Sequence, residues 1–299
     1  MAERAIGIDV GGTKIAAGVI DRNGRILRRV ERPTPTESRD EFLELLDEIV
    51  DDLRAEAAEA IGFGLPSTID QRTGRVVGSV HVPLADFDFR DHAAARFSIP
   101  VALDNDGNAA AIAEWKIGAG RGASDMIMLT LGTGVGGGLI LDGKPYRGWV
   151  GAGAEIGHMV LAYGGEPCTG NCTGHGHFEQ VSSGRAADRK AVELLGPDAT
   201  GRELVGAARD GNGEALEAVR EIGRRLGAAL GSLVNVFNPE VIVIGGGFSQ
   251  ARDLFLEPAL ETMKLEALPP GRDLVRVVPA LLGPDAGLVG AGFVGFEAL

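Results

Sequence analysis

The sequence is poor in cysteine and has no long apolar run. Its 299 residues include two cysteines, too few for a disulfide scaffold in a chain of this length. It contains no stretch of about 18 apolar residues, which excludes a transmembrane helix. The N-terminal MAER leads into a strand pattern without the apolar core of a signal peptide. We therefore expect a cytoplasmic location and no membrane partner.

Positive charge is scarce as well. The 29 Lys and Arg residues are outnumbered by 42 Asp and Glu residues, and the net charge is −13. Because a nucleic-acid phosphate backbone is bound by basic patches, we expect no nucleic-acid partner. The remaining composition, 44% hydrophobic and 24% charged, is typical of a globular chain with material for a core. The length favours about two domains.

Strand-like and helix-like segments alternate along the chain, which predicts an α/β fold. Apolar runs bounded by turn residues predict strands over 5–10, 14–21, 24–32, 60–65, 100–103, 239–247 and 274–278. Apolar residues at helical spacing predict helices over 40–59, 182–195, 201–211, 213–235 and 285–299. The stretch 151–180 is irregular and rich in Gly, Cys and His.

The hairpin pattern AIGIDVGGTKIAAGVID at 5–21 recurs about 120 residues later. MIMLTLGTGVGGGLILDGK at 126–144 again gives an apolar strand, a glycine-rich tip and an apolar strand. Repetition at this distance favours a duplicated domain over a solenoid, whose repeats span about 20–50 residues. Two unrelated glycine-rich hairpins are the alternative. A domain boundary is expected near 107–125.

Both glycine-rich tips have the composition of a phosphate site. Glycine lets a ligand approach the backbone closely, and successive exposed N–H groups form an anion-binding concavity. In the first tip Thr13 adds a hydroxyl donor, and Asp9 supplies a carboxylate that can hold a metal ion through water. A third run of glycines, 245–247, follows another strand. No G-x-x-x-x-G-K-[ST] motif is present at either tip, so neither is a P-loop.

Asp-x-Gly-Gly-Thr-Lys at 9–14 resembles the ROK family of sugar kinases, members of the actin/hexokinase/Hsp70 ATPase superfamily. LGTGVGGG at 131–138 resembles the second phosphate loop of that family. NPEVIVIGGG at 238–247 resembles its adenosine-side strand and turn, and DAGLVGAG at 285–292 resembles its C-terminal helix. The resemblance covers nearly the whole chain, in the expected order.

This resemblance implies a two-lobed actin-like ATPase fold, a duplicated ribonuclease H-like architecture with the active-site cleft between the lobes. The small α/β lobe is expected over 1–107 together with the C-terminal helix 285–299. The large α/β lobe is expected over 108–284. ATP and catalytic Mg²⁺ are the implied cofactors. The residues expected to hold them are Asp9, Gly11, Gly12, Thr13, Lys14, Gly132, Thr133, Gly134, Gly245, Gly246 and Gly247.

The stretch LDNDGNAAA places three polar side chains after the strand at 100–103. A sugar kinase needs a base near the attacking hydroxyl, and the carboxyl ends of strands are where α/β sheets bind ligands. From the residues alone, capping of the next helix by Asp106 or Asn108 explains the stretch equally well. The resemblance assigns Asp106 as the general base and Asn105 as a sugar contact, leaving the cap to Asn108. Asp104 is expected to face away from the sugar.

Further sugar contacts are implied by the same resemblance at Glu155, His158, Glu179, Ser67 and Gly138. Ser67 stands where glycine is usual in the family, and His81 replaces an asparagine. These two departures leave the preferred sugar open.

The segment after His158 resembles the zinc loop of the family, a His followed by C-x-C-G-x-x-G-C-x-E. Here the first two cysteines are three residues apart, and His177 stands in the third cysteine position. The implied structural Zn²⁺ ligands are His158, Cys168, Cys172 and His177, a set that zinc accepts. Two free thiols with ordinary loop histidines are the alternative, as is His175 in place of His177.

The resemblance implies an ATP-dependent hexokinase in carbohydrate metabolism, with glucose as the first candidate and its 6-hydroxyl as the acceptor. Mannose, fructose, allose or an N-acetylhexosamine, and polyphosphate as donor, are alternatives. A sugar-responsive repressor would need a helix-turn-helix before the strand at Ala5, and a non-catalytic sugar-binding protein would not need Asp106 and both tips. A homodimer or homotetramer is implied.

Overall fold

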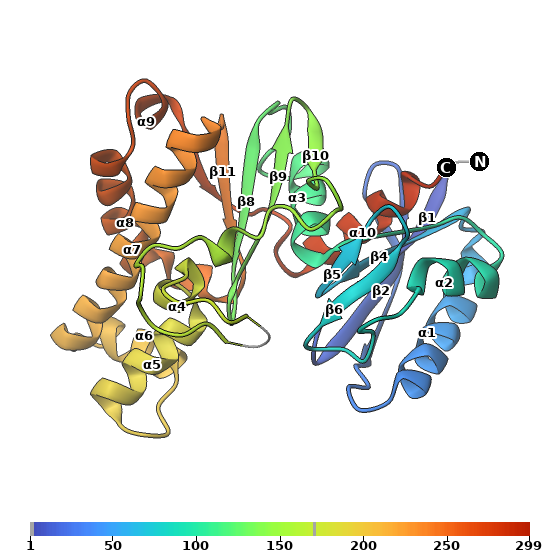
Figure 1. The fold of residues 1–299 in the computed structure, drawn as a ribbon, viewed down its shortest axis with the longest axis horizontal. Helices are drawn as coiled ribbons and strands as arrows, with labels where there is room; N and C mark the ends of the chain where they lie inside the picture. The colour runs from blue at the N-terminus through green and yellow to red at the C-terminus, as the bar shows by residue number, and fades with distance from the viewer. Residues whose placement is uncertain (1–2, 170–171) are drawn as a thin grey trace. The chain divides into compact units, whose positions relative to one another are not determined.

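The computed structural model describes residues 3–169 and 172–299, and its fold is α/β as predicted (Figure 1). The chain divides into two compact units. Unit 1 consists of Met1–Ser124, Gly138–Ala154 and Leu281–Leu299, and unit 2 of Asp125–Gly137 and Glu155–Ala280. The chain therefore passes from one unit to the other four times, and strand β9 (Val135–Leu141) contains one of these passages.

Unit 1 is built on a five-stranded sheet with the order β3-β2-β1-β4-β7. Strands β1, β2 and β3 pair antiparallel, whereas β1, β4 and β7 pair parallel. Its elements are β1 (Arg4–Val10), β2 (Lys14–Asp21), β3 (Ile26–Pro33), α1 (Arg39–Leu53), β4 (Ala60–Leu65), β5 (Ser67–Asp70), β6 (Arg75–Ser79), α2 (Phe89–Phe97), β7 (Val101–Asn105), α3 (Asp106–Ile117), β10 (Lys144–Tyr146) and α10 (Ala286–Phe296).

Two apolar clusters cover the two faces of this sheet. On one face, α1 and α2 pack side chains such as Phe42 and Phe89 against the strands. On the other, α3 and α10 contribute Ile112 and Leu288 (Figure 1). Helix α10 lies so close to β4 that a Cβ on Gly62 would be 1.8 Å from the carbonyl oxygen of Ala291. Unit 1 is thus a three-layer sandwich in which helices cover both faces of the sheet, and only the edge strand β3 stays largely exposed.

Unit 2 takes part in a second five-stranded sheet, with the order β10-β9-β8-β11-β12. Its long helix α7 packs tightly on α8, because glycines on α7 let the backbones approach. The elements of unit 2 are β8 (Met126–Leu131), α4 (Phe178–Val181), α5 (Gly184–Leu195), α6 (Gly201–Arg209), α7 (Gly213–Phe237), β11 (Val241–Gly245), α8 (Arg252–Glu266), α9 (Gly271–Leu274) and β12 (Arg276–Pro279).

The two sheets repeat one strand plan, which confirms the predicted duplication. In each sheet a meander of three strands is followed by two further parallel strands. The first of these pairs with the first strand of the meander, β1 or β8, and the second pairs with the first added strand. Each glycine-rich tip joins the first two strands of its meander. The repeated hairpin seen in the sequence therefore marks the start of each half.

Some predicted bounds differ from the structure. Helix α1 ends at Leu53 instead of continuing to residue 59, because the following residues offer no large apolar side chain to bury, and Ala57 adopts a left-handed conformation with φ 55°. The units also differ in extent from the predicted lobes 1–107 with 285–299 and 108–284. Helix α3 belongs to unit 1 because it packs on α10. The division into catalytic lobes stays a prediction.

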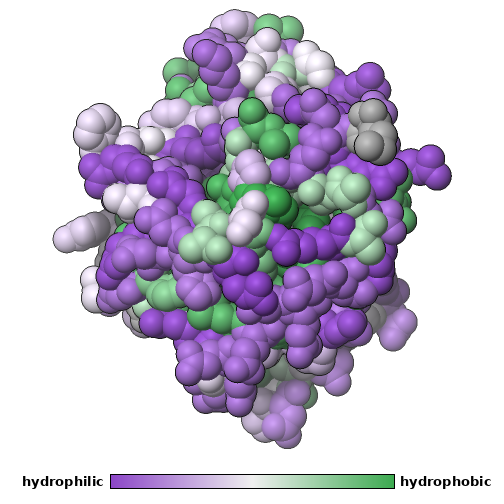
Figure 2. All heavy atoms as spheres, turned by 90° about the vertical axis from the view of Figure 1, so that its right-hand side faces the viewer, coloured by the Kyte–Doolittle hydropathy of each residue, from purple (hydrophilic) through white to green (hydrophobic). Residues whose placement is uncertain are grey.

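Hydrophilic side chains cover most of the face in Figure 2, around a smaller group of apolar ones near its centre. This agrees with the abundance of charged residues in the sequence. Among residues 3–169 and 172–299, none of the helices combines the length and apolar character needed to cross a membrane.

Candidate functional site

The first glycine-rich tip is a tight turn in unit 1 between β1 and β2. The backbone N–H of Gly11 donates to the carbonyl of Lys14 at 2.9 Å. Thr34 holds the tip from one side: its hydroxyl donates to the Gly11 carbonyl at 2.7 Å, and its N–H donates to the Thr13 carbonyl at 3.1 Å. This role of Thr34 could not be predicted, since a single threonine after a strand forms no recognisable sequence pattern.

Asp9 lies at the end of β1 beside this tip and is packed against glycine. A Cβ on Gly287 would be 2.2 Å from Asp9 Oδ2, so the start of α10 lies directly against the carboxylate. Burial raises the pKa of Asp9 to about 6, and the charge of Lys14 opposes this only in part. Lys14 itself forms an exposed ion pair with Glu31 at 3.3 Å.

His81 is a second residue near the tip. A Cβ on Gly12 would lie 3.3 Å from the Cβ of His81, whose side chain is exposed. The sequence identified His81 only as a departure from the family pattern. Its place against Gly12 depends on the fold and could not be derived from the chain order.

The junction of β7 and α3 carries the expected base. Asn105 is the N-cap of α3, and its side-chain oxygen accepts the N–H of Gly107 at 2.8 Å. Asp106, the first helical residue, accepts the same N–H at 2.8 Å and is half-buried. The expectation that Asn108 caps the helix is wrong. Asn108 lies within the helix and donates through Nδ2 to Asp104 at 2.9 Å.

Two other expected sugar residues of unit 1 lie in packed surroundings. Ser67 is 6% exposed on β5, and its hydroxyl pairs with that of Ser79 at 3.0 Å. Gly138 on β9 lies against the first turn of α3, where a Cβ would be 2.5 Å from Ala111 Cβ. Any larger residue at position 138 would therefore displace the helix that carries Asp106.

The second glycine-rich tip lies in unit 2, between β8 and β9. The start of α5 holds it, because the N–H groups of Gly184 and Arg185 donate to the carbonyls of Gly132 and Thr133 at 2.7 and 3.1 Å. The glycine turn after β11 packs beside it. There Gly246 has a φ of 86°, and a Cβ on it would be 2.5 Å from the Leu131 carbonyl. Unit 2 thus brings the glycines of 132–134 and 245–247 together.

Glu179 lies against the same tip, since a Cβ on Gly134 would be 2.4 Å from Glu179 Oε2. Glu155 and His158 come from the segment around a short 3₁₀ helix, Ile156–His158. The loss of surrounding water raises the pKa of Glu155; the positive character of His158 lowers it, and the carboxylate of Glu179 raises it further. Unit 2 therefore contains three of the polar residues that the family resemblance assigns to the sugar, Glu155, His158 and Glu179.

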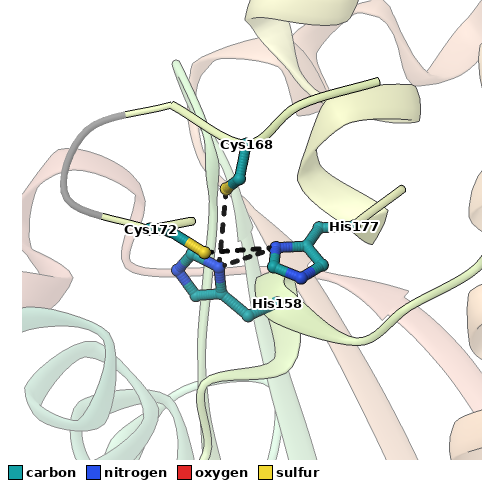
Figure 3. A group of neighbouring side chains, drawn as sticks. All are labelled: His158, Cys168, Cys172 and His177. Carbon is teal, nitrogen blue, oxygen red and sulfur yellow. Dashed lines mark hydrogen bonds between the residues drawn. The ribbon is translucent and has the colours of Figure 1, made fainter. Parts of the chain in front are cut away.

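The four predicted metal ligands converge in unit 2 (Figure 3). One ligand atom from each of His158, Cys168, Cys172 and His177 lies within 4.8 Å of the others. The Nδ1 atoms of the two histidines are 3.1 Å apart. Cys168 Sγ is 3.7 Å from Nδ1 of His158, and Cys172 Sγ is 3.7 Å from Nδ1 of His177.

His175 lies outside this group and forms an isolated β-bridge with Pro167. His177, the N-cap of α4, is 7% exposed and faces the cysteines. Between the two histidines that the sequence left open, the geometry favours His177. Cys168 also donates to Glu179 Oε1 at 3.2 Å, which links the metal group to a predicted sugar residue.

Comparison with known proteins agrees with this arrangement. The model of the ROK family matches residues 5–294. A glucokinase of Streptomyces coelicolor is 36% identical over 96% of this chain and 95% of its own length. The crystal structure of a ROK hexokinase from Thermus thermophilus superposes with a TM-score of 0.89 at 37% identity, covering 98% of both chains.

A ROK family glucokinase from Streptomyces griseus, solved in complex with glucose and AMPPNP, superposes with a TM-score of 0.85 at 34% identity. The match covers 98% of this chain and 99% of that one. The resemblance seen in the glycine tips and the C-terminal helix thus extends over the whole fold. The chain belongs to the ROK family.

Proposed function

We propose that this chain is an ATP-dependent hexokinase that phosphorylates the 6-hydroxyl of a hexose, with glucose as the first candidate. The observation that carries the proposal is the placement of Asp106. It is the first residue of α3, at the carboxyl end of a parallel strand, with its backbone fixed by the Asn105 cap. The glucokinase relatives at 34–36% identity support the same reaction.

Asp106 is the proposed general base. As the 6-hydroxyl attacks the γ-phosphorus, the new O–P bond forms, the bridging P–O bond to ADP breaks, and the hydroxyl proton passes to Asp106. The N-terminus of α3 favours the ionised carboxylate through the helix dipole. Phosphoryl transfer depends chiefly on positioning and charge stabilisation, and we assign both to the glycine tips, whose N–H groups suit phosphate.

Asp9, at the first tip, suits a cation. Among the residues that the structure describes, Lys14 is the charge that favours its ionised form, and burial opposes that form. A hard cation with oxygen ligands would compensate for this. We therefore propose that Asp9 binds Mg²⁺, directly or through water. The other residues of the first tip, Gly11, Gly12, Thr13 and Lys14, are proposed to contact the phosphates. When bound, Mg²⁺ offsets the negative charge of the phosphate groups.

Gly132, Thr133, Gly134, Gly245, Gly246 and Gly247 are the proposed nucleotide residues of unit 2. This assignment is supported by the packing of the two glycine turns against each other. Exclusion of water from the bound sugar and nucleotide completes the proposal, since otherwise hydrolysis of ATP would compete.

The proposed sugar contacts are Asn105, Glu155, His158, Glu179, Ser67 and Gly138. His158 directs Nδ1 toward the metal group, which leaves Nε2 for a sugar hydroxyl. Several donors and acceptors are needed because a hexose carries hydroxyls on many carbons.

We further propose a structural Zn²⁺ at His158, Cys168, Cys172 and His177. Tetrahedral zinc, with Zn–N about 2.0–2.1 Å and Zn–S about 2.3 Å, separates neighbouring nitrogens by about 3.3 Å and nitrogen from sulfur by about 3.6 Å. The observed separations of 3.1 and 3.7 Å fit this geometry. The ion would crosslink the loop that carries His158 to the helix that carries Glu179.

Other hexoses remain a second candidate, because His81 and Ser67 depart from the family pattern near the expected sugar residues. Polyphosphate as donor, a homodimer or homotetramer, and a cytoplasmic location stay predictions. The direct test measures ADP release from ATP across a panel of hexoses, and formation of sugar phosphate when polyphosphate replaces ATP. We expect release that depends on the sugar and is highest with glucose. ATP hydrolysis that no sugar stimulates would contradict the kinase proposal.

A further inference from the structure

Asp104, two residues before the proposed base, is a fully buried carboxylate with three donors. The side chain is 0% exposed. Its Oδ1 accepts the backbone N–H of Asn105 at 2.8 Å and Nδ2 of Asn108 at 2.9 Å. Both donors flank Asp106 in the sequence, one on each side. Through these two hydrogen bonds, the buried carboxylate of Asp104 holds the turn that carries the proposed base.

The other oxygen of this carboxylate is held by Arg147. Arg147 Nε donates to Asp104 Oδ2 at 2.6 Å, and its Nη2 reaches Glu297 at 2.7 Å. The Arg147 side chain is 23% exposed and Glu297 is 41% exposed, so the bond to Asp104 is the sheltered one. Because a buried carboxylate must be paired, Arg147 supplies the positive charge that Asp104 requires.

Arg147 also begins a closed loop that leads to Glu155. The N–H of Gly153 donates to the Arg147 carbonyl at 2.8 Å. Gln71 ties the same loop to β7, because its N–H donates to Val150 and its Nε2 to Leu103, both at 2.8 Å. Two sets of bonds thus fasten this loop to the strand that ends at Asn105.

We propose that Arg147 is a positioning residue for phosphoryl transfer, acting through Asp104 to fix the turn that carries Asp106. The inference rests on the proposed function, because it takes Asp106 as the base. Arg147 does not need to touch sugar or nucleotide in this role. Its effect comes from geometry, since a displacement of about 1 Å in a catalytic group can cost about a hundredfold in rate.

The test compares Arg147→Met with the wild type and with a matched control, Arg75→Met. Arg75 is also in unit 1 and pairs with Asp88 at 2.8 Å, but at the surface. We expect Arg147→Met to lower kcat by about tenfold to a hundredfold with little change in the sugar KM. Arg75→Met should keep wild-type kinetics. A turnover of Arg147→Met within twofold of wild type, per folded molecule, overturns the inference.

A double variant separates positioning from stability. Arg147→Met alone leaves a buried charge unpaired, which lowers the Tm. Asp104→Asn with Arg147→Met removes both charges, so we expect the Tm to recover and kcat to stay low. Recovery of both would mean that the pair acts only on stability, and would overturn the inference.

Amide hydrogen exchange gives a readout that does not need activity. In Arg147→Met we expect faster exchange at Asn105 and Gly107, the amides bonded in this turn, and unchanged exchange in Arg75→Met. Unchanged exchange at both amides overturns the inference. If the wild-type chain phosphorylates no sugar, the proposed function fails, and the exchange result still decides whether Arg147 orders the turn.

Discussion

Asn105 caps helix α3 by accepting the N–H of Gly107 at 2.8 Å, and Asp106 shares that same N–H. The local backbone is therefore held by two acceptors, and Asp106→Asn leaves both in place because an amide oxygen also accepts. We expect Asp106→Asn to fold normally and to lose at least about a hundredfold in kcat, because general-base catalysis is worth roughly 10²–10⁴. Steady-state kinetics with sugar affinity measured separately would check this.

The matched control is Asp91→Asn. Asp91 is an exposed residue in the first turn of α2, so its position relative to a helix start is similar. It should keep wild-type turnover. A near-normal kcat for Asp106→Asn, with sugar affinity kept, would reject Asp106 as the base.

Asp9 is expected to lower the stability of the fold at neutral pH. Burial raises its pKa from 3.8 to about 6 in the folded chain. An acid whose folded pKa is raised contributes stability below its unfolded pKa and loses it as the pH rises through the folded value. We therefore expect Asp9→Asn to raise the free energy of unfolding at pH 7.5, in Mg²⁺-free buffer, by about 1–3 kcal/mol.

The same substitution should lose its advantage near pH 4, where the wild-type carboxyl is largely protonated. Added Mg²⁺ should stabilise the wild type more than the variant, because a cation that binds only the folded state shifts unfolding by mass action. Denaturant unfolding at the two pH values measures both effects. A variant less stable than wild type at pH 7.5 without Mg²⁺ would contradict the account of Asp9.

The proposed zinc site predicts different effects for substitutions of His175 and His177. Purified protein should contain about one equivalent of zinc if the four clustered side chains among the described residues bind one tetrahedral ion. His177→Ala should lose most of this zinc, because His177 Nδ1 lies among the cysteines. His175→Ala should retain it, because His175 lies outside the group. Elemental analysis after dialysis measures the zinc content of the wild type and of both variants. A fully active, metal-free wild type would contradict the proposed zinc site.

Much of the fold could be predicted from the sequence because its signals are local. Strands 14–21 and 60–65 were predicted with their observed bounds, since the apolar run of the first ends at the turn Asp21–Gly24 and that of the second at Pro66. Helix α8 was missed because Pro258 lies inside it and interrupts the expected pattern. Helix α2 was given no bounds, because its short sequence FRDHAAARF offers only three buried residues, Phe89, Ala93 and Phe97, to mark the helical spacing.

In the candidate site, too, features that depend on residues close in the chain could be predicted, whereas contacts between distant residues could not. The four proposed metal ligands could be named from the sequence because they lie within 20 residues of one another, in a stretch that resembles the zinc loop of the family. The bond between Arg147 and Asp104 joins residues 43 apart in the chain, and no spacing rule connects them. The choice of Asn105 over Asn108 as helix cap also required the backbone, since both are good capping residues one turn apart.

The close contact between β4 and α10 gives a test of packing that does not involve the site. A Cβ at Gly62 would lie 1.8 Å from the carbonyl oxygen of Ala291 and 2.3 Å from the nitrogen of Gly295. Gly62→Ala must therefore push α10 from the sheet, and we expect a loss of at least about 3 kcal/mol in the free energy of unfolding.

At Gly206 the same change, glycine to alanine, is expected to stabilise the fold. This residue lies within α6, and a Cβ there would meet no heavy atom within 4 Å. Alanine is favoured over glycine inside a helix, so Gly206→Ala should raise the free energy of unfolding by about 0.5–1 kcal/mol. Denaturant unfolding of both variants gives the comparison. Equal effects at the two positions would mean that backbone entropy, and not the approach of α10 to β4, decides the cost at Gly62.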